Sequence, residues 1–126
     1  MTAGLQLMII DDEPIVGKRL KRMFEKEGYA VETFLDGVSA IEALEKKHFD
    51  IIVTDLMMGN VDGMKVLDAA VKKNAGTRVI IITGFGDQQT IDEALNKGAS
   101  DFLVKPFKFE ELYKAVKKAE TGLKAT

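Results

Sequence analysis

The sequence contains no cysteine, no tryptophan, a single histidine and two prolines. The absence of cysteine excludes disulfide bonds, thiolate catalysis and zinc sites built on sulfur. Aliphatic runs such as 7–10 (LMII) are far shorter than the ~20 residues that span a membrane. No cationic segment followed by a long apolar one opens the chain, so we expect no secretory signal, no membrane contact and a cytoplasmic location.

The sequence also has no large excess of positive or negative side chains. The 18 Lys and Arg residues nearly balance the 20 Asp and Glu residues, which gives a net charge of -2. This balance provides no broad basic surface, and we therefore expect no direct binding of nucleic acid.

The length and the apolar content predict one globular domain. The chain has 126 residues, of which 46% are hydrophobic and 30% are charged. Domains typically contain about 100–200 residues, and this composition is that of a folded chain with an ordinary core. We expect a single domain over residues 1–126, with a core over about 6–121 and no output domain in this chain.

Short apolar runs alternate with segments of helical period. The runs IIV (51–53) and VIII (79–82) are continuous and β-branched, as in strands that are buried on both faces. Five strand–helix units indicate an α/β fold, with a parallel sheet covered by helices on both faces. Glycines that follow the helical segments predict left-handed caps, at Gly28, Gly76, Gly98 and Gly122. The predicted strands are 6–11, 29–34, 50–55, 78–83 and 101–104.

Polar residues that can take part in binding or catalysis lie where these strands end. In an open parallel sheet, ligands bind outside the carboxyl ends of the strands. We therefore expect three carboxylates, a hydroxyl and an ammonium group to meet at one edge. The residues concerned are Asp11, Asp12, Asp55, Thr83 and Lys105, and Gly84 follows Thr83 there.

Three neighbouring carboxylates repel one another, and a hard divalent cation relieves that repulsion. Mg²⁺ prefers oxygen ligands, and Mn²⁺ could substitute for it. A phosphoryl group carrying about two negative charges would then meet both a metal ion and the ammonium group. Carboxylates are known nucleophiles toward phosphoryl groups. This set of residues indicates phosphoryl transfer to an aspartate.

Four motifs in this order carry a resemblance to a known family. They are IIDDEP (9–14), TDLMM (54–58), TGFG (83–86) and DFLVKPF (101–107). Together they resemble the receiver domain of two-component response regulators, over residues 7 to about 119. The resemblance implies a flavodoxin-like (βα)5 sandwich with a five-stranded parallel sheet in the strand order 2-1-3-4-5.

The resemblance also implies a role for each residue around the metal ion. Asp55 is expected to be the phosphoacceptor. Asp12 and Asp55 would bind Mg²⁺ directly, Asp11 would act largely through water, and the backbone carbonyl of Met57 would be a further ligand.

A second set of residues would contact the phosphoryl group or respond to it. By the resemblance, Lys105 contacts the phosphoryl group and the Asp55 carboxylate, in a Lys105–Pro106 peptide that is commonly cis. The Thr83 hydroxyl and the Gly84 amide would receive phosphoryl oxygens. Phe102 would be the aromatic switch that turns inward when Thr83 moves.

The loop after Asp55 departs from the family pattern, because Gly59 stands where proline is expected. Two positions that influence the lifetime of the acyl phosphate in this family are the apolar Met57 and Phe85. Neither side chain can orient water, so we hypothesise a shielded, long-lived phosphoryl group.

The implied partners are a sensor histidine kinase or a histidine phosphotransfer protein, and a downstream effector or output domain. Candidate contacts for the kinase are Ile15, Lys18, Pro106 and Phe107. A dimer that depends on phosphorylation is a further option. The protein would be a signalling module that assists only its own phosphoryl transfer and autodephosphorylation, and not an enzyme.

Other interpretations of the same residues remain. Asp11 and Asp12 could cap the first helix, with Pro14 in its opening turn. A Mg²⁺-dependent phosphohydrolase of the haloacid-dehalogenase kind would want a second aspartate where Met57 stands. A receiver-like interaction domain that takes no phosphate is the third reading. His48 is expected to be a surface residue and not a ligand.

Overall fold

The computed structural model describes residues 4–56, 63–74, 76–84 and 88–124. Five strands alternate with five helices along the described chain. The strands are β1 (Gln6–Ile10), β2 (Ala30–Phe34), β3 (Ile51–Asp55), β4 (Arg78–Thr83) and β5 (Asp101–Val104). The helices are α1 (Pro14–Lys26), α2 (Gly37–Lys46), α3 (Gly63–Lys73), α4 (Gln88–Asn96) and α5 (Phe109–Lys124). Among these helices, none has the length and apolar character needed to cross a bilayer.

The strands form one parallel sheet in the order β2-β1-β3-β4-β5, as expected from the resemblance. β3 is buried along its whole length, because it lies between β1 and β4 and has helices on both faces. The observed strands begin or end within one residue of the predicted ones. The parallel register places the last residues of β1, β3 and β4 at the same edge, with Asp55 opposite Ile82.

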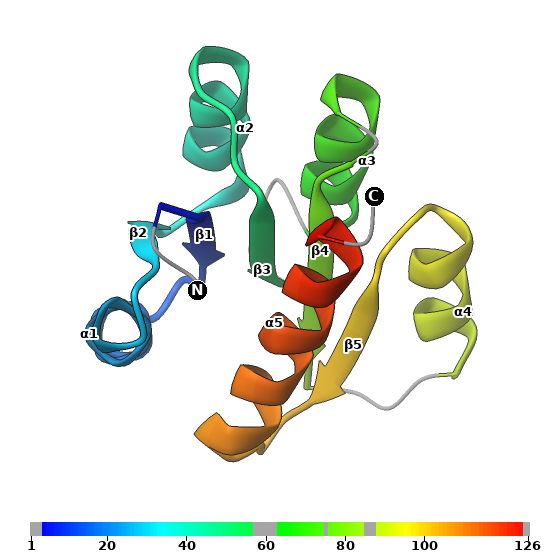
Figure 1. Ribbon diagram of the computed structural model, residues 1–126. Coiled ribbons are helices and arrows are strands. Elements are labelled where there is room, and N and C mark those ends of the chain that lie inside the picture. The colour runs from blue at the N-terminus through cyan, green and yellow to red at the C-terminus, as the bar shows by residue number, and fades with distance from the viewer. Residues whose placement is uncertain (1–3, 57–62, 75, 85–87, 125–126) are drawn as a thin grey trace.

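The helices form two layers, one on each face of the sheet (Figure 1). α1 and α5 cover one face, where Phe24 packs 5.0 Å from the ring of Phe109 and Leu112 is fully buried. α2, α3 and α4 cover the other face, where Leu67 and Ile52 are fully buried. This double covering explains why the central strands carry continuous apolar runs.

Two of the four predicted glycine caps are confirmed. Gly28 and Gly98 have φ angles of 97° and 113°, a conformation that glycine adopts at low cost. The prediction for Gly122 was wrong, because this residue lies inside α5. Gly76 does not have a positive φ either; its amide donates to the Asn74 side chain at 2.8 Å, in an asparagine turn.

Hydrogen bonds between distant residues hold α5 against α1 and β2. The Tyr29 hydroxyl donates to Oε1 of the buried Glu120 at 2.7 Å. The Tyr113 hydroxyl donates to Oε1 of Glu27 at 3.1 Å. Burial, together with the hydrogen bond to Glu120, raises the pKa of Tyr29 well above its usual value. The phenol therefore stays a proton donor throughout the physiological range, and α5 stays anchored.

Candidate functional site

Three carboxylates meet at the carboxyl edge of the sheet. Asp55 is the last residue of β3, and Asp11 and Asp12 follow β1 directly. One oxygen of each carboxylate lies within 4.8 Å of an oxygen of the other two. Asp11 and Asp55 are only 4% and 6% exposed, whereas Asp12 is open to solvent. The structure thus brings together the three acids that the sequence placed at strand ends.

Lys105 adds a positively charged group to this cluster of carboxylates. Its Nζ lies 2.6 Å from Oδ2 of Asp55 and 3.8 Å from Oδ2 of Asp11. Its backbone amide donates to the carbonyl of Thr83 at 2.8 Å, which fixes the lysine next to the end of β4. The Lys105–Pro106 peptide is cis, as the resemblance implied.

The pKa values of two residues in this cluster, Asp11 and Lys105, are shifted. Burial is the main reason that the pKa of Asp11 lies above its usual value, and the charges of Asp55 and Asp12 add to this effect. Burial alone would lower the pKa of Lys105. The hydrogen bond and the charge of Asp55, helped by Asp11, outweigh burial, so the Lys105 pKa is raised. At neutral pH the ammonium group is charged beside Asp55.

Thr83 and Phe102 lie on the neighbouring strands. Thr83 ends β4, is 2% exposed and is paired in register with Val104 of β5. Phe102 is paired with Ile81 and packs on the α2–α3–α4 face. Since alternate residues of a strand share a face, Thr83 lies on the same face as Ile81 and Phe102. Gly84 follows Thr83, and apart from its chain neighbours no atom of the described residues lies within 4 Å of the position of a Cβ.

Three predicted positions, Met57, Gly59 and Phe85, lie outside the described residues. Their proposed effects on metal binding and phosphoryl lifetime stay predictions. Timing of phosphate loss from the phosphorylated chain tests the second of them, because loss within seconds would contradict a shielded acyl phosphate.

The capping alternative for Asp11 is partly realised. Oδ1 of Asp11 accepts the amide of Glu13 at 2.8 Å, and Pro14 opens α1. Oδ2 of the same carboxylate faces Lys105. One oxygen therefore orders the start of α1, and the other takes part in the acidic cluster, so the two interpretations are compatible.

The backbone around Asp55 is held by a glycine that the sequence analysis did not single out. The Gly63 amide donates to the Leu56 carbonyl at 2.8 Å, where α3 begins. A Cβ added to Gly63 would lie 2.5 Å from the carbonyl oxygen of Asp55 and 2.9 Å from Cα of Leu56. Such distances are shorter than any real contact, so the backbone can approach Asp55 this closely only at a glycine.

The substitution Gly63→Ala is expected to destabilise the domain by about 1–3 kcal/mol, because the added methyl group forces the backbone apart. It should also weaken the properties that depend on the Asp55 position, such as Mg²⁺ binding. Urea denaturation and a Mg²⁺ titration followed by NMR measure the two effects. The matched control is Gly84→Ala, whose new methyl group would meet no atom of the described residues within 4 Å, so its loss of stability should be far smaller. Equal stability of Gly63→Ala and wild type would refute the close approach.

The donor set of the acidic cluster fits a hard divalent cation. The three carboxylates offer only oxygen ligands, and their closeness is unfavourable without a cation. The sole histidine, His48, is 53% exposed and hydrogen bonds to Asp50 at 3.0 Å, so it is the surface residue that was predicted. Asp11, Asp12 and Asp55 could therefore hold Mg²⁺ or Mn²⁺ but do not form a zinc site.

A model of the response regulator receiver domain matches residues 7–117 of the chain. The chain belongs to this family. Receiver domains are signalling modules of two-component systems, and they have no dedicated catalytic role. The resemblance that four sequence motifs suggested is therefore confirmed over most of the chain.

The curated relatives differ in how much of them the receiver domain makes up. Sporulation initiation phosphotransferase F of Bacillus subtilis is 31% identical, over 90% of this chain and 91% of its own length. Transcriptional regulatory protein TcrA of Mycobacterium tuberculosis is 32% identical over 88% of this chain, but only 44% of its own length. Regulatory protein AtoC of Escherichia coli is 33% identical over 94% of this chain, but only 26% of its own length. The chain thus spans less than half the length of TcrA and of AtoC, and nearly the whole length of the phosphotransferase.

Solved structures confirm the fold. A receiver domain protein of Clostridium thermocellum has a TM-score of 0.89 and 28% identity, and the match covers 96% of this chain and 98% of the other. A response regulator of Burkholderia pseudomallei has a TM-score of 0.83 and 26% identity, over 96% of this chain and 71% of the other. That structure is described with a phosphorylated aspartic acid, a calcium ion and citrate.

Proposed function

We propose that this receiver domain accepts a phosphoryl group on Asp55 from a phosphohistidine of a sensor histidine kinase or a histidine phosphotransfer protein. The observation that carries the proposal is the contact of Lys105 Nζ with Asp55 Oδ2 at 2.6 Å, beside the carboxylates of Asp11 and Asp12. A buried aspartate held by a cation at the edge of a parallel sheet is poised to act as a nucleophile.

The transfer makes one bond and breaks one bond. A carboxylate oxygen of Asp55 attacks phosphorus, an O–P bond forms, and the N–P bond of the donor histidine breaks, returning the electron pair to the imidazole nitrogen. Lys105 keeps the carboxylate oriented and offers its ammonium group to the oxygens of the incoming group. Thr83 and Gly84, at the end of β4, are proposed to donate to those oxygens as well.

Asp11, Asp12 and Asp55 would hold a Mg²⁺ ion, with the backbone carbonyl of Met57 as a further proposed ligand. Bound Mg²⁺ would neutralise charge on the phosphoryl oxygens and on the carboxylates. Lys105 holds the attacking carboxylate in position. Its Nζ contacts Asp55, and its backbone amide donates to the Thr83 carbonyl.

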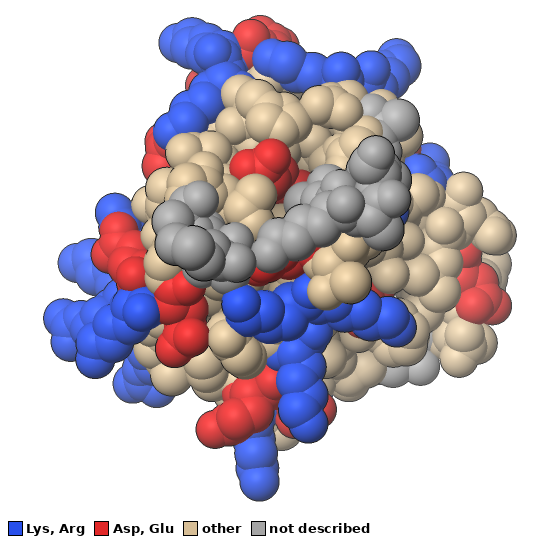
Figure 2. Space-filling model, in the orientation of Figure 1, with Lys and Arg blue, Asp and Glu red and all other residues tan. Residues whose placement is uncertain are grey.

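A groove beside the acidic cluster supports a docking surface for the donor protein. It has a volume of about 690 Å³ and lies between α1 and the segment that follows β5. The groove is mostly apolar, and Ile15 on its rim is 73% exposed. Basic side chains, with acidic ones between them, gather over α1 at the left of Figure 2. α1 also carries Lys18, which lies outside the groove lining. Apolar lining residues include Ile15, Val16, Met23, Pro106, Phe107 and Phe109.

This surface would fit a partner that presents an apolar helix face flanked by acidic residues. The proposed contacts Ile15, Pro106 and Phe107 all line the groove. Asp11 and Lys105 also line it, so a partner seated there would place its histidine next to Asp55. The output partner, whether a separate effector or a domain joined to this chain, would respond to the phosphorylated state.

The response is proposed to pass through Thr83 and Phe102. Both side chains lie on one face of neighbouring strands, and Phe102 is only partly buried against the α2–α3–α4 core. When Thr83 moves to donate to the phosphoryl group, the space that it leaves lets Phe102 turn inward. The change would alter the surface formed by α4, β5 and α5.

Bound beryllofluoride, a mimic of the phosphoryl group, is expected to shift the NMR signals of the amides of 83–84 and 101–104. The expected reason is the coupled movement of Thr83 and Phe102. Thr83→Ala should keep the shifts near Asp55 and lose most of those in 101–104. Unchanged 101–104 signals in the wild-type protein would contradict the switch without contradicting phosphorylation.

Acetyl phosphate, a small phosphoryl donor, tests the proposed function directly. Intact mass spectrometry should show one added phosphoryl group per chain in the presence of Mg²⁺, and little in the presence of a chelator. No added group under conditions that phosphorylate another receiver domain would refute the proposal. Catalytic turnover of a generic phosphate ester would favour a phosphohydrolase.

A further inference from the structure

A second charged pocket lies at the opposite edge of the sheet from Asp55. It has a volume of about 190 Å³, is open to solvent, and is lined by α5 and by the amino ends of β4 and β5. A designed cavity of about 150 Å³ is large enough for benzene, so this space can hold a small molecule. It is about 16 Å from the acidic cluster along β4, given the rise per residue of a strand. The polar lining residues are Arg78, Ser100, Asp101 and Lys118.

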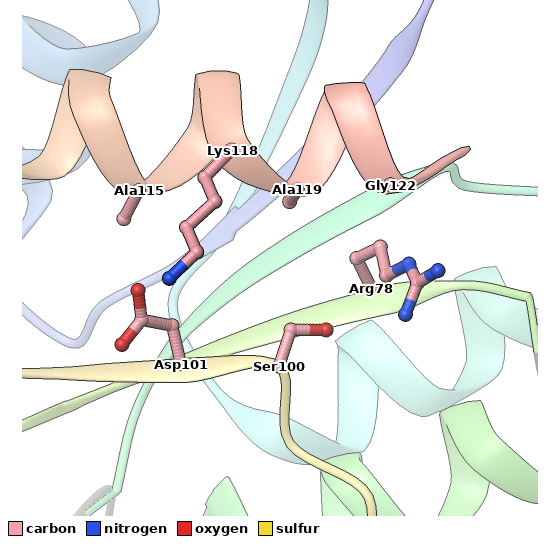
Figure 3. A pocket seen from close by; sticks show the side chains of 7 residues that line it. All are labelled: Arg78, Ser100, Asp101, Ala115, Lys118, Ala119 and Gly122. Atoms are coloured by element: carbon pink, nitrogen blue, oxygen red, sulfur yellow. The ribbon is translucent and has the colours of Figure 1, made fainter. Parts of the chain in front are cut away.

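The side chain of Arg78 is held in this pocket with a buried donor that lacks a partner. Nε of Arg78 is buried and makes no hydrogen bond to any described residue. A buried donor without an acceptor costs about 1–3 kcal/mol, and this nitrogen gains an acceptor only if an occupant of the pocket draws the guanidinium toward it. The guanidinium lies under α5 next to Gly122 (Figure 3). A Cβ at Gly122 would come within 3.3 Å of Nη2, so glycine makes room for the guanidinium.

Three other polar groups surround the same space. Figure 3 shows the Lys118 ammonium group reaching down from α5 to Asp101, and the Ser100 hydroxyl directed toward Arg78. The ion pairs among the described residues include neither Arg78 nor Lys118. The amide of Ser100 donates to the Val79 carbonyl at 2.7 Å, which fixes the hydroxyl beside β4. The pocket thus combines two cations, a hydroxyl and one carboxylate.

We propose that this pocket binds hydrogen phosphate, or the phosphate group of a small molecule, between Arg78, Lys118 and Ser100. The two cations and the hydroxyl supply donors to the phosphate oxygens, which charge-assisted hydrogen bonds favour. Asp101 accepts the Phe102 amide at 2.8 Å through Oδ1, which leaves Oδ2 to accept a further donor. Hydrogen phosphate carries an O–H group that Asp101 can accept, whereas sulfate has none at neutral pH. The carboxylate therefore makes the site selective for phosphate over sulfate.

This site does not involve Asp55 and goes beyond the proposed phosphoacceptor function. It joins α5 to the start of β4 and β5, so an occupant would tie together two elements of the α4–β5–α5 surface. The concentration of phosphate compounds could then adjust how α5 packs, independently of the phosphorylation state.

The test is an NMR titration of the full chain with sodium phosphate, sodium sulfate and sodium chloride at equal ionic strength and in the presence of a chelator. Phosphate should produce saturable shifts in the amides of 78, 100–101 and 118–122, and sulfate should bind about tenfold more weakly. Lys118→Gln, on an exposed side chain, should weaken phosphate binding about tenfold. Arg78→Gln should do the same, and Lys114→Gln, one helical turn away on α5, serves as the matched control.

Asp101→Asn should remove the preference for phosphate while the anion still binds, because an amide can donate to either anion. Equal shifts with chloride, shifts that do not saturate, or full binding in Lys118→Gln would each overturn the proposal, and would identify an adventitious ion only. The same holds if sulfate binds as tightly as phosphate to the wild-type chain. Asp55→Asn should leave this titration unchanged, so a failure here is distinguishable from a failure at the phosphoacceptor.

Discussion

The Asp55→Asn variant is expected to take up no phosphoryl group from acetyl phosphate and Mg²⁺, where the wild-type chain takes up one. An amide is a poor nucleophile toward phosphorus, whereas the Asp55 carboxylate has one oxygen oriented by Lys105 at 2.6 Å. The fold should persist, because asparagine has the same shape and its oxygen can still accept from Lys105. Intact mass spectrometry and circular dichroism measure the two properties.

The matched control is Asp68→Asn, which removes a carboxylate on α3 that is 53% exposed and pairs with Lys97 at 3.4 Å. Its uptake should equal that of the wild-type chain. Peptide mapping should place the phosphoryl group on Asp55 in both proteins that accept it. Uptake by Asp55→Asn at the wild-type level, or mapping to another carboxylate, would remove Asp55 from the proposed role.

The Asp11→Asn variant is expected to be more stable than the wild-type protein without metal, and to bind Mg²⁺ about 10–100-fold more weakly. Burial raises the pKa of Asp11, so its charged form is less favourable in the folded chain than in the unfolded one. Relief of such a charge typically increases the free energy of unfolding by about 0.5–2 kcal/mol. The asparagine oxygen can still accept the Glu13 amide, so the start of α1 should remain ordered.

The pH dependence follows from the same shift. The ordinary pKa of Asp11 is 3.8, and the folded-state pKa lies above it. The folded chain therefore keeps the proton to higher pH, and this group lowers the stability as the pH rises from 3.8 through the folded-state pKa. The cost is complete above the folded-state pKa and absent in acid, where the carboxyl is protonated in both states.

Urea denaturation with a chelator, between about pH 4 and pH 7, measures this effect as the difference between the two proteins. The difference should grow with pH. Added Mg²⁺ should stabilise the wild-type chain much more than Asp11→Asn. Asp36→Asn, at the exposed N-cap of α2, is the control and should not change the response to Mg²⁺. A variant that is less stable than wild type at neutral pH without metal would contradict the account.

The strand–helix order was predictable because it is encoded locally. A run such as 79–82 (VIII) is too short for a helix and too continuous for a half-exposed strand, so it indicates a buried strand wherever it packs. The glycine cap at Gly122 was the exception. The sequence pattern there resembled a helix end, but α5 continues through Gly122 and passes over Arg78.

The residues of the acidic cluster were also predictable, since parallel strands bring their carboxyl ends to one edge. Asp11 and Asp55 are separated by 44 positions in the chain, and the β1–β3 register alone brings them to the same edge. The close approach of Gly63 to the Asp55 carbonyl could not be predicted in this way. It depends on how α3 docks against the end of β3, and a glycine in a sequence carries no mark of what its missing side chain would meet.

By itself, the amino-acid sequence determined the class of fold and the set of groups at the carboxyl edge, because hydrophobic periodicity and strand-end positions are local properties. The strand order was implied only by the resemblance of its motifs to a known family. Only the tertiary structure decided that Lys105 contacts Asp55 at 2.6 Å, that Asp11 divides its two oxygens between α1 and Lys105, and that Arg78 keeps a buried donor beside Lys118. The physical reason is that such contacts arise from side-chain conformations and helix docking. Both are set by the packing of the whole core around them.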